Sequence, residues 1–121
     1  MQRTLATLSA LAMLTACATS RPSVASWSEC ARYTAESRLE AGIPAGWPTA
    51  EAVPEGVAVQ VVSLGAYPPE ATHDALFRTL HLVPSSNSYY VEQTGGFVGL
   101  RQLYGPVSLA GTCVASAVSA P

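Results

Sequence analysis

Hydrophobic and polar residues follow two different periods along the chain, one in its N-terminal third and the other beyond it. Ser26-Trp27-Ser28-Glu29 is typical of a capping box, in which a serine hydroxyl and a glutamate side chain cap the first helical turn. Apolar and small residues then recur at helical spacing, at Trp27, Cys30, Ala31, Thr34 and Ala41. The pattern predicts one helix over residues 27–41, ended by Gly42 and Pro44.

Beyond the helix the pattern changes to that of β-strands. Residues 43–56 contain three prolines and two glycines and are expected to form a loop. Residues 57–64 are β-branched and nearly all apolar, which predicts a strand buried on both faces or central in a sheet. Three further strands are expected over residues 76–83, 88–94 and 97–104. Pro84-Ser85-Ser86-Asn87 and Gly95-Gly96 would supply the two turns between them.

The turn lengths predict a register for these strands. A four-residue turn at 84–87 pairs His81 with Tyr90, and a two-residue turn at 95–96 pairs Tyr90 with Arg101 and Glu92 with Gly99. The resulting alternation has one apolar face and one wetter face, as in an antiparallel meander that is buried on one side. The predicted fold class is therefore α+β, with one N-terminal helix packed on a roughly four-stranded antiparallel meander.

The wetter face is the candidate site for binding a partner. It would carry two cross-strand rows, His81–Tyr90–Arg101 and Thr79–Glu92–Gly99, and Tyr90 could lie diagonally over Gly99. One interpretation is a binding patch in which an aromatic ring, a cation and an imidazole meet a partner. The other is an ordinary solvated face on which Glu92 pairs with Arg101. The candidate partner-binding residues are His81, Tyr90, Glu92, Phe97, Gly99 and Arg101.

The N-terminus has the pattern of an export signal. A short positive start at Arg3 precedes an apolar run over residues 5–14 that is too short to span a membrane. Leu14-Thr15-Ala16-Cys17 resembles the lipobox of bacterial lipoproteins. The resemblance implies a signal peptide over residues 1–16, a lipidated tether over 17–25 and a small domain over 26–121. An ordinary signal peptide followed by a chance cysteine is the alternative interpretation.

In lipoproteins of this type the lipobox cysteine carries diacylglycerol, and the new amino terminus is usually acylated, for example with palmitate. The resemblance therefore implies a diacylglyceryl cysteine at Cys17, held in the membrane by its acyl chains. In a Gram-negative source, Asp directly after this cysteine favours the inner membrane. Ala18 stands there instead, which implies the periplasmic face of the outer membrane.

Two further cysteines, Cys30 and Cys113, are far apart in the sequence. In an exported protein an even pair of this kind is expected to form a disulfide. The bond would tie the first structured element to the last. Two free buried thiols are the alternative, and metal binding by two lone, distant cysteines is a third.

Composition and motifs narrow the classes of function. A formal charge of -2 and a pI near 5.5 argue against nucleic-acid binding. The sequence contains no nucleophile elbow, phosphate-binding glycine loop or His-Glu-x-x-His motif. Glu70, His73 and Asp74 could ligate a metal only if residues 70–78 were helical, and an exposed acidic turn explains them better. We therefore expect neither an enzyme, a cofactor nor a metal.

The stretch Gly95-Gly96-Phe97-Val98-Gly99 resembles the Gly-Gly-Phe-Ala-Gly stretch of emfourin-type inhibitors of bacterial metalloproteases, with Val98 in place of alanine. This resemblance implies an alternative function as a periplasmic proteinaceous inhibitor of a hydrolase, either a metalloprotease or a muramidase. The first hypothesis is a non-catalytic, lipid-anchored envelope lipoprotein. It would present a small protein-binding domain in the periplasm to an envelope protein.

Overall fold

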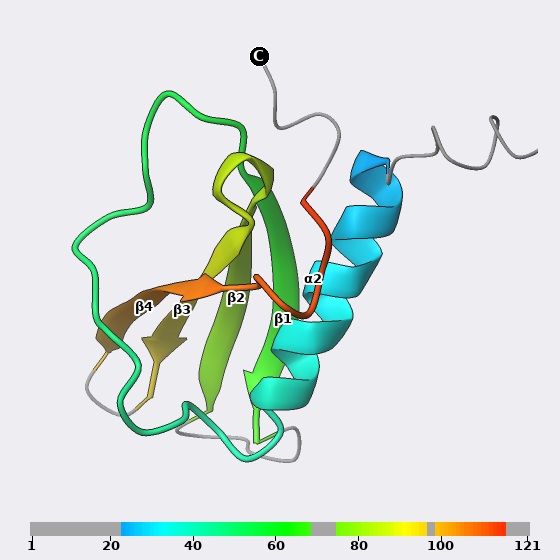
Figure 1. Ribbon diagram of the computed structural model, residues 1–121. Helices are drawn as coiled ribbons and strands as arrows, with labels where there is room; N and C mark the ends of the chain where they lie inside the picture. The colour runs from blue at the N-terminus through cyan, green and yellow to red at the C-terminus, as the bar shows by residue number, and fades with distance from the viewer. Residues whose placement is uncertain (1–22, 69–74, 97–98, 116–121) are drawn as a thin grey trace, which may run out of the picture.

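One helix lies against one face of a four-stranded antiparallel sheet in the computed structural model, which describes residues 23–68, 75–96 and 99–115 (Figure 1). The helix α2 spans Val24–Arg38. The strands are β1 (Gln60–Tyr67), β2 (Leu76–Val83), β3 (Ser88–Gly95) and β4 (Leu100–Ser108), and they neighbour one another in sequence order. The predicted α+β class and antiparallel meander are confirmed.

The helix α2 begins earlier than the sequence pattern indicated. Its N-cap is Ser23, whose hydroxyl accepts a hydrogen bond from the Ser26 backbone N–H, while Ser26 accepts one from the Ser23 N–H. The capping box is thus formed by two serines, and the prediction of Ser26 as N-cap with Glu29 as its partner was wrong. The helix ends at Arg38 with Leu39 as C-cap, so Ala41 lies beyond it and is exposed.

The main core lies between α2 and the sheet. Trp27, Ala31 and Ala35 follow one another at intervals of one helical turn and are fully buried. They face a group of buried sheet residues that are spaced two apart along β2 and β3: Leu80, Leu82, Tyr89 and Val91. Trp47, from the loop after the helix, meets the ring of Tyr89 edge-on at 5.9 Å. Trp47 therefore packs its loop against this core.

The hairpin of β2 and β3 has the predicted register. His81 pairs with Tyr90 and Thr79 with Glu92. Between the strands, a short 3-10 helix at Pro84–Ser86 is followed by Asn87 in the left-handed conformation with φ 51°, which asparagine tolerates better than most residues. The Asn87 side chain also accepts a hydrogen bond from the Trp27 indole at 2.7 Å. The turn is thereby joined to the helix.

The strand β1 differs in position and environment from the prediction. It starts three residues later than expected and forms one edge of the sheet, with β2 as its hydrogen-bonded neighbour. Val61 is 65% exposed, so the prediction of a strand buried on both faces or central was wrong. The residues that do face the helix, Val62 and Leu64, are partly buried against the core. The apolar run therefore reflects a strand covered on one side only.

The hairpin of β3 and β4 also differs from the prediction. Gly95 pairs with Leu100, so the loop that joins the strands covers residues 96–99 rather than Gly95-Gly96 alone. Arg101 consequently lies opposite Thr94, and Leu103 lies opposite Glu92. The predicted partners were Tyr90 for Arg101 and Gly99 for Glu92, and both were wrong. Because the displacement is an even number of residues, residues 100–104 keep their predicted faces of the sheet.

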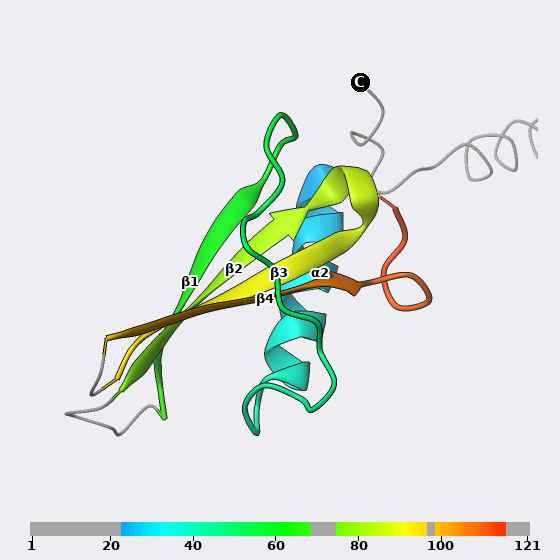
Figure 2. The same cartoon turned by 90° about the vertical axis from the view of Figure 1, so that its left-hand side faces the viewer.

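The long loop over residues 40–59 closes the other edge of the sheet and part of its second face. The Ala50 N–H donates to the Leu103 carbonyl at 2.9 Å, and the Gly105 N–H donates to the Pro48 carbonyl at 2.8 Å. In Figure 2 this loop passes in front of β3 and β4, while α2 lies behind them. A second buried cluster forms beneath it, in which Val83, Tyr90 and Leu103 are covered by Ala50, Val53 and Val59.

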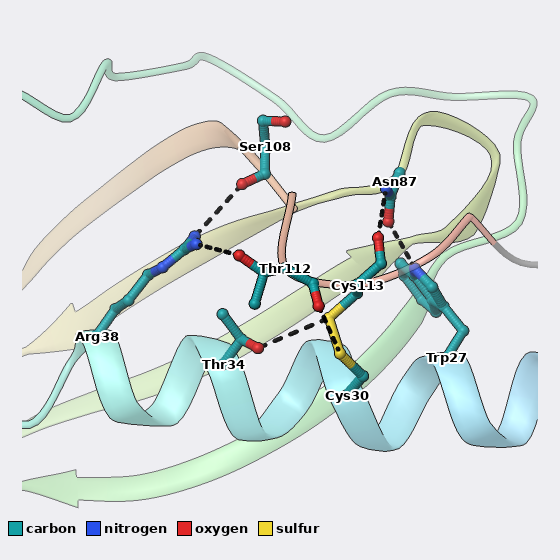
Figure 3. The surroundings of a disulfide bond; sticks show 8 residues. All are labelled: Trp27, Cys30, Thr34, Arg38, Asn87, Ser108, Thr112 and Cys113. Carbon is teal, nitrogen blue, oxygen red and sulfur yellow. Dashed lines mark hydrogen bonds between the residues drawn. A yellow bond between two sulfur atoms is a disulfide. The ribbon is translucent and has the colours of Figure 1, made fainter. Parts of the chain in front are cut away.

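Cys30 and Cys113 form the expected disulfide, with a Cα–Cα distance of 5.9 Å. The bond joins α2 to the segment that follows β4 (Figure 3). Asn87 and Arg38 hold the same segment, by donating to the Cys113 carbonyl and the Thr112 hydroxyl respectively. Within the described ranges, no helix is both long and apolar enough to cross a membrane.

Candidate functional site

The open patch is the part of the second sheet face that the loop leaves uncovered. It comprises six residues of β2, β3 and β4 whose side chains point away from α2: Phe77, Thr79, His81, Glu92, Thr94 and Arg101. Phe77 is 54% exposed near the start of β2, which is unusual for a phenylalanine on a sheet face. An exposed aromatic ring beside a group of charges is a common composition for a protein-binding surface.

Glu92 is the centre of the polar part of the open patch. Its Oε1 lies 3.1 Å from His81 Nε2, and its Oε2 accepts a hydrogen bond from Arg101 Nε at 2.7 Å. The His81 and Glu92 side chains are only 15% and 21% exposed, whereas that of Arg101 is 57% exposed. The arrangement therefore holds the imidazole and the carboxylate in place and leaves most of the guanidinium free to contact a partner.

These contacts change the acidity of Glu92. Partial burial alone would raise the pKa of this carboxyl group. The hydrogen bonds and charges of His81 and Arg101 outweigh the burial, so the pKa of Glu92 lies below its ordinary value. A carboxyl group whose pKa falls on folding stabilises the folded state above its ordinary pKa. That stabilisation is lost as the pH falls through the lowered value.

We expect the free energy of unfolding of Glu92→Gln to fall less steeply than that of the wild type as the pH is lowered through the acidic range. Below pH 4.5, the wild-type protein should lose the additional free energy of unfolding that it has over the variant at higher pH. The difference should be less than about 1 kcal/mol for each partly exposed pair. Urea unfolding across the acidic range measures it. Arg101→Gln, which removes one of the two partners, should show part of the same effect. If the free energies of unfolding of Glu92→Gln and wild type changed equally with pH, the lowered pKa of Glu92 would be contradicted.

Tyr90 does not belong to the open patch, although the sequence placed it there. It is 8% exposed and lies in the cluster under the loop. The bare backbone against which its ring packs is that of Gly105, whose hypothetical Cβ would come within 2.7 Å of the ring. The prediction that Tyr90 lies over Gly99 was therefore wrong. The register shift of β4 is the cause, because it places Leu103 opposite Glu92, where Gly99 was expected, and brings Gly105 beside Tyr90 in place of Arg101.

The structure describes only some of the remaining candidate residues from the sequence. Gly99 is exposed in the loop between β3 and β4, with φ 65°. Phe97 lies outside the described residues, as do Cys17 and the proposed metal ligands Glu70, His73 and Asp74. Among the residues that the structure does describe, no group of three metal-ligating side chains occurs. Phe77 belongs to the open patch although it was not among the sequence candidates.

No family model matches the chain, and no curated protein or solved structure is significantly similar to it.

Proposed function

We propose that this chain is a non-catalytic lipoprotein that is anchored through Cys17 and presents the open patch to a protein partner in the cell envelope. The observation that carries the binding role is Phe77, which is 54% exposed beside a fixed pair of charged residues. A soluble domain gains nothing in stability from an exposed phenylalanine, whereas a partner that covers it removes its apolar surface from water.

The envelope location rests on sequence and on the disulfide. The lipobox-like segment Leu14-Thr15-Ala16-Cys17 lies outside the described residues, so its support is the sequence pattern alone. The bond between Cys30 and Cys113 supports export independently, because disulfides persist in oxidising compartments and are rare in the cytosol. With Ala18 after the cysteine, we propose the periplasmic face of the outer membrane.

Anchoring is tested by Cys17→Ser. We expect this variant to leave the membrane fraction and to lack acyl groups in intact-mass analysis, since one hydroxyl cannot replace the thioether to diacylglycerol. Ala18→Asp is the matched control. It should keep its acyl groups and move towards the inner-membrane fraction. Retention of Cys17→Ser in the membrane fraction would contradict the anchor.

Partner binding is tested by photocrosslinking in cells. A photoreactive residue placed at Phe77 or Arg101 should form a covalent adduct with one dominant envelope protein. The same residue at Glu29, which is exposed on α2 behind the sheet, should not. Equal adducts at all three positions would mean that the open patch is not the contact surface. An adduct with a metalloprotease or a muramidase would favour the inhibitor hypothesis, whereas one with an assembly or transport protein would favour the first.

A further inference from the structure

The two outer edges of the sheet differ in how far other parts of the chain pair with their backbone groups. The outer edge of β4 is covered by residues 48–50 through backbone hydrogen bonds of 2.9 Å and 2.8 Å and a bridge between Thr49 and Tyr104. The outer edge of β1 has no such cover. Among the residues that the structure describes, none makes a backbone hydrogen bond to the side of β1 that faces away from β2. Half of the backbone groups of this strand are therefore unpaired with protein.

The strand β1 also lacks most of the features that normally prevent an edge from pairing. Natural edge strands carry charged side chains or prolines, or they are interrupted by bulges. Within its bounds, Gln60–Tyr67, β1 has neither a charged residue nor a proline. It does have a bulge, because its register with β2 shifts between Ser63 and Gly65. The regular part of the free edge is thus residues 60–63, which is long enough for a short ladder.

A groove of about 450 Å³ lies on the helix side of this edge. Arg32, Tyr33 and Glu36 of α2 line it on one side, and Ser63, Leu64 and Arg78 of the sheet line it on the other. The guanidinium of Arg78 donates to the Leu39 carbonyl at 2.9 Å and stacks 4.2 Å from the ring centre of Tyr67. Its Nε is buried with no partner in the described residues. The groove therefore offers polar contacts to side chains that enter it.

The opposite side of the edge is apolar. The side chain of Val61 is on the face of the sheet away from α2, where it is 65% exposed. Side chains alternate between the two faces of a strand. A strand added beside residues 60–63 would consequently direct one set of side chains over Val61 and the other set towards α2, where the groove begins at Ser63 and Leu64. Backbone pairing would supply affinity, and the two flanks would supply specificity.

We infer that β1 binds an extended segment of a partner protein as a fifth strand of the sheet. The segment has an apolar side chain where it passes Val61, and polar side chains at the alternate positions that enter the groove beside Arg78. The free edge determines the extended form of the segment, because only an extended backbone matches the spacing of the unpaired groups. This contact uses the outer edge of β1 and involves neither Phe77 nor Arg101, although Val61 pairs with His81 of the open patch. It does not depend on the lipid anchor.

The test uses the exported full chain and a displayed library of random ten-residue peptides. We expect enrichment of peptides with alternating apolar and polar residues. Two N-methylated series of the best peptide provide the decisive comparison. In an added strand, every second backbone N–H faces the sheet. Methylation of one alternate set should weaken binding by about tenfold or more, while methylation of the other set should have little effect.

Amide hydrogen exchange locates the bound peptide. Saturating peptide should slow exchange within residues 60–63 and leave β4 unchanged. Val61→Lys should weaken binding without unfolding the chain, since this side chain is mostly exposed. Phe77→Ala and Arg101→Ala should bind the peptide as the wild type does, so failure of the open patch and failure of the β1 edge are distinguishable.

Four results would overturn the inference. The first is a library without enriched peptides, and the second is equal sensitivity of the peptide to both methylated series. The third is slowed exchange that excludes β1. The fourth is a peptide-free dimer, detected by sedimentation, whose slowed amides are those of β1. In that case a second copy of the chain would occupy the edge.

Discussion

The double variant Cys30→Ala/Cys113→Ala should unfold with a free energy about 4–5 kcal/mol below that of the oxidised wild type. The two cysteines are separated by 83 positions, and in the chain-entropy model a loop of this length gives a stabilisation of that size. The bond acts mainly by restricting the unfolded chain. Urea unfolding of both proteins under the same conditions measures the difference in free energy.

Reductant provides the control for this prediction. It should destabilise the wild-type protein to about the level of the double variant and leave the variant itself unchanged. The contacts from Asn87 and Arg38 to the segment after β4 do not involve sulfur, so the variant should keep the fold in the absence of urea. A wild-type protein that is equally stable with and without reductant would contradict the role of the bond.

The hairpin of β2 and β3 could be predicted from the sequence because its turn is specified locally. Asparagine at position 87 tolerates the left-handed conformation that ends the turn, and its φ is 51°. Once the turn is fixed, the pairing of His81 with Tyr90 follows without any information from the rest of the chain. The disulfide was predictable for a different reason, since the export-like N-terminal pattern favours disulfides and only two cysteines remain after Cys17.

The hairpin of β3 and β4 could not be fixed in the same way. Gly95, Gly96 and Gly99 all have positive φ. Because glycine adopts positive φ readily, these residues are compatible with either a two-residue turn at 95–96 or the loop at 96–99. The shorter turn fits the general preference of hairpins. The loop over residues 40–59 favours the longer connection instead. It pairs with β4 around Leu103 and Gly105 through contacts between residues distant in sequence.

The same loop explains why the candidate site was predicted only in part. His81, Glu92 and Arg101 were assigned to one face, and the structure places them within hydrogen-bonding distance around the Glu92 carboxylate. Tyr90 was assigned with them but is covered by Val53 and its neighbours. A segment rich in proline and glycine has no periodicity from which its packing could be inferred. The alternation of a strand therefore shows which side chains share a face but not which of them a loop covers.

Gly105 is the position in β4 where the packing of Tyr90 leaves no room for a side chain. Its φ is 136°, and a Cβ there would lie 2.7 Å from Tyr90 Cδ2 and 3.0 Å from the Tyr89 carbonyl oxygen. The backbone oxygen is held in the sheet and cannot move away as a flexible side-chain end would. Alanine therefore adds a steric clash in the second cluster to the strain of an unfavourable backbone conformation.

Gly105→Ala should accordingly lower the free energy of unfolding by about 3–5 kcal/mol, which is large for the addition of one methyl group. Gly99→Ala is the matched control, because Gly99 also has a positive φ, of 65°, but no atom lies within 4 Å of its Cβ position. Strain alone should cost the control about 1–2 kcal/mol. Urea unfolding of the two variants and the wild type separates the cost of the steric clash from the cost of the backbone strain. If Gly105→Ala were no less stable than Gly99→Ala, the contact between Tyr90 and the Gly105 backbone would not be close enough to exclude a side chain. The loop over residues 40–59 would then hold Tyr90 less tightly than its 8% exposure indicates.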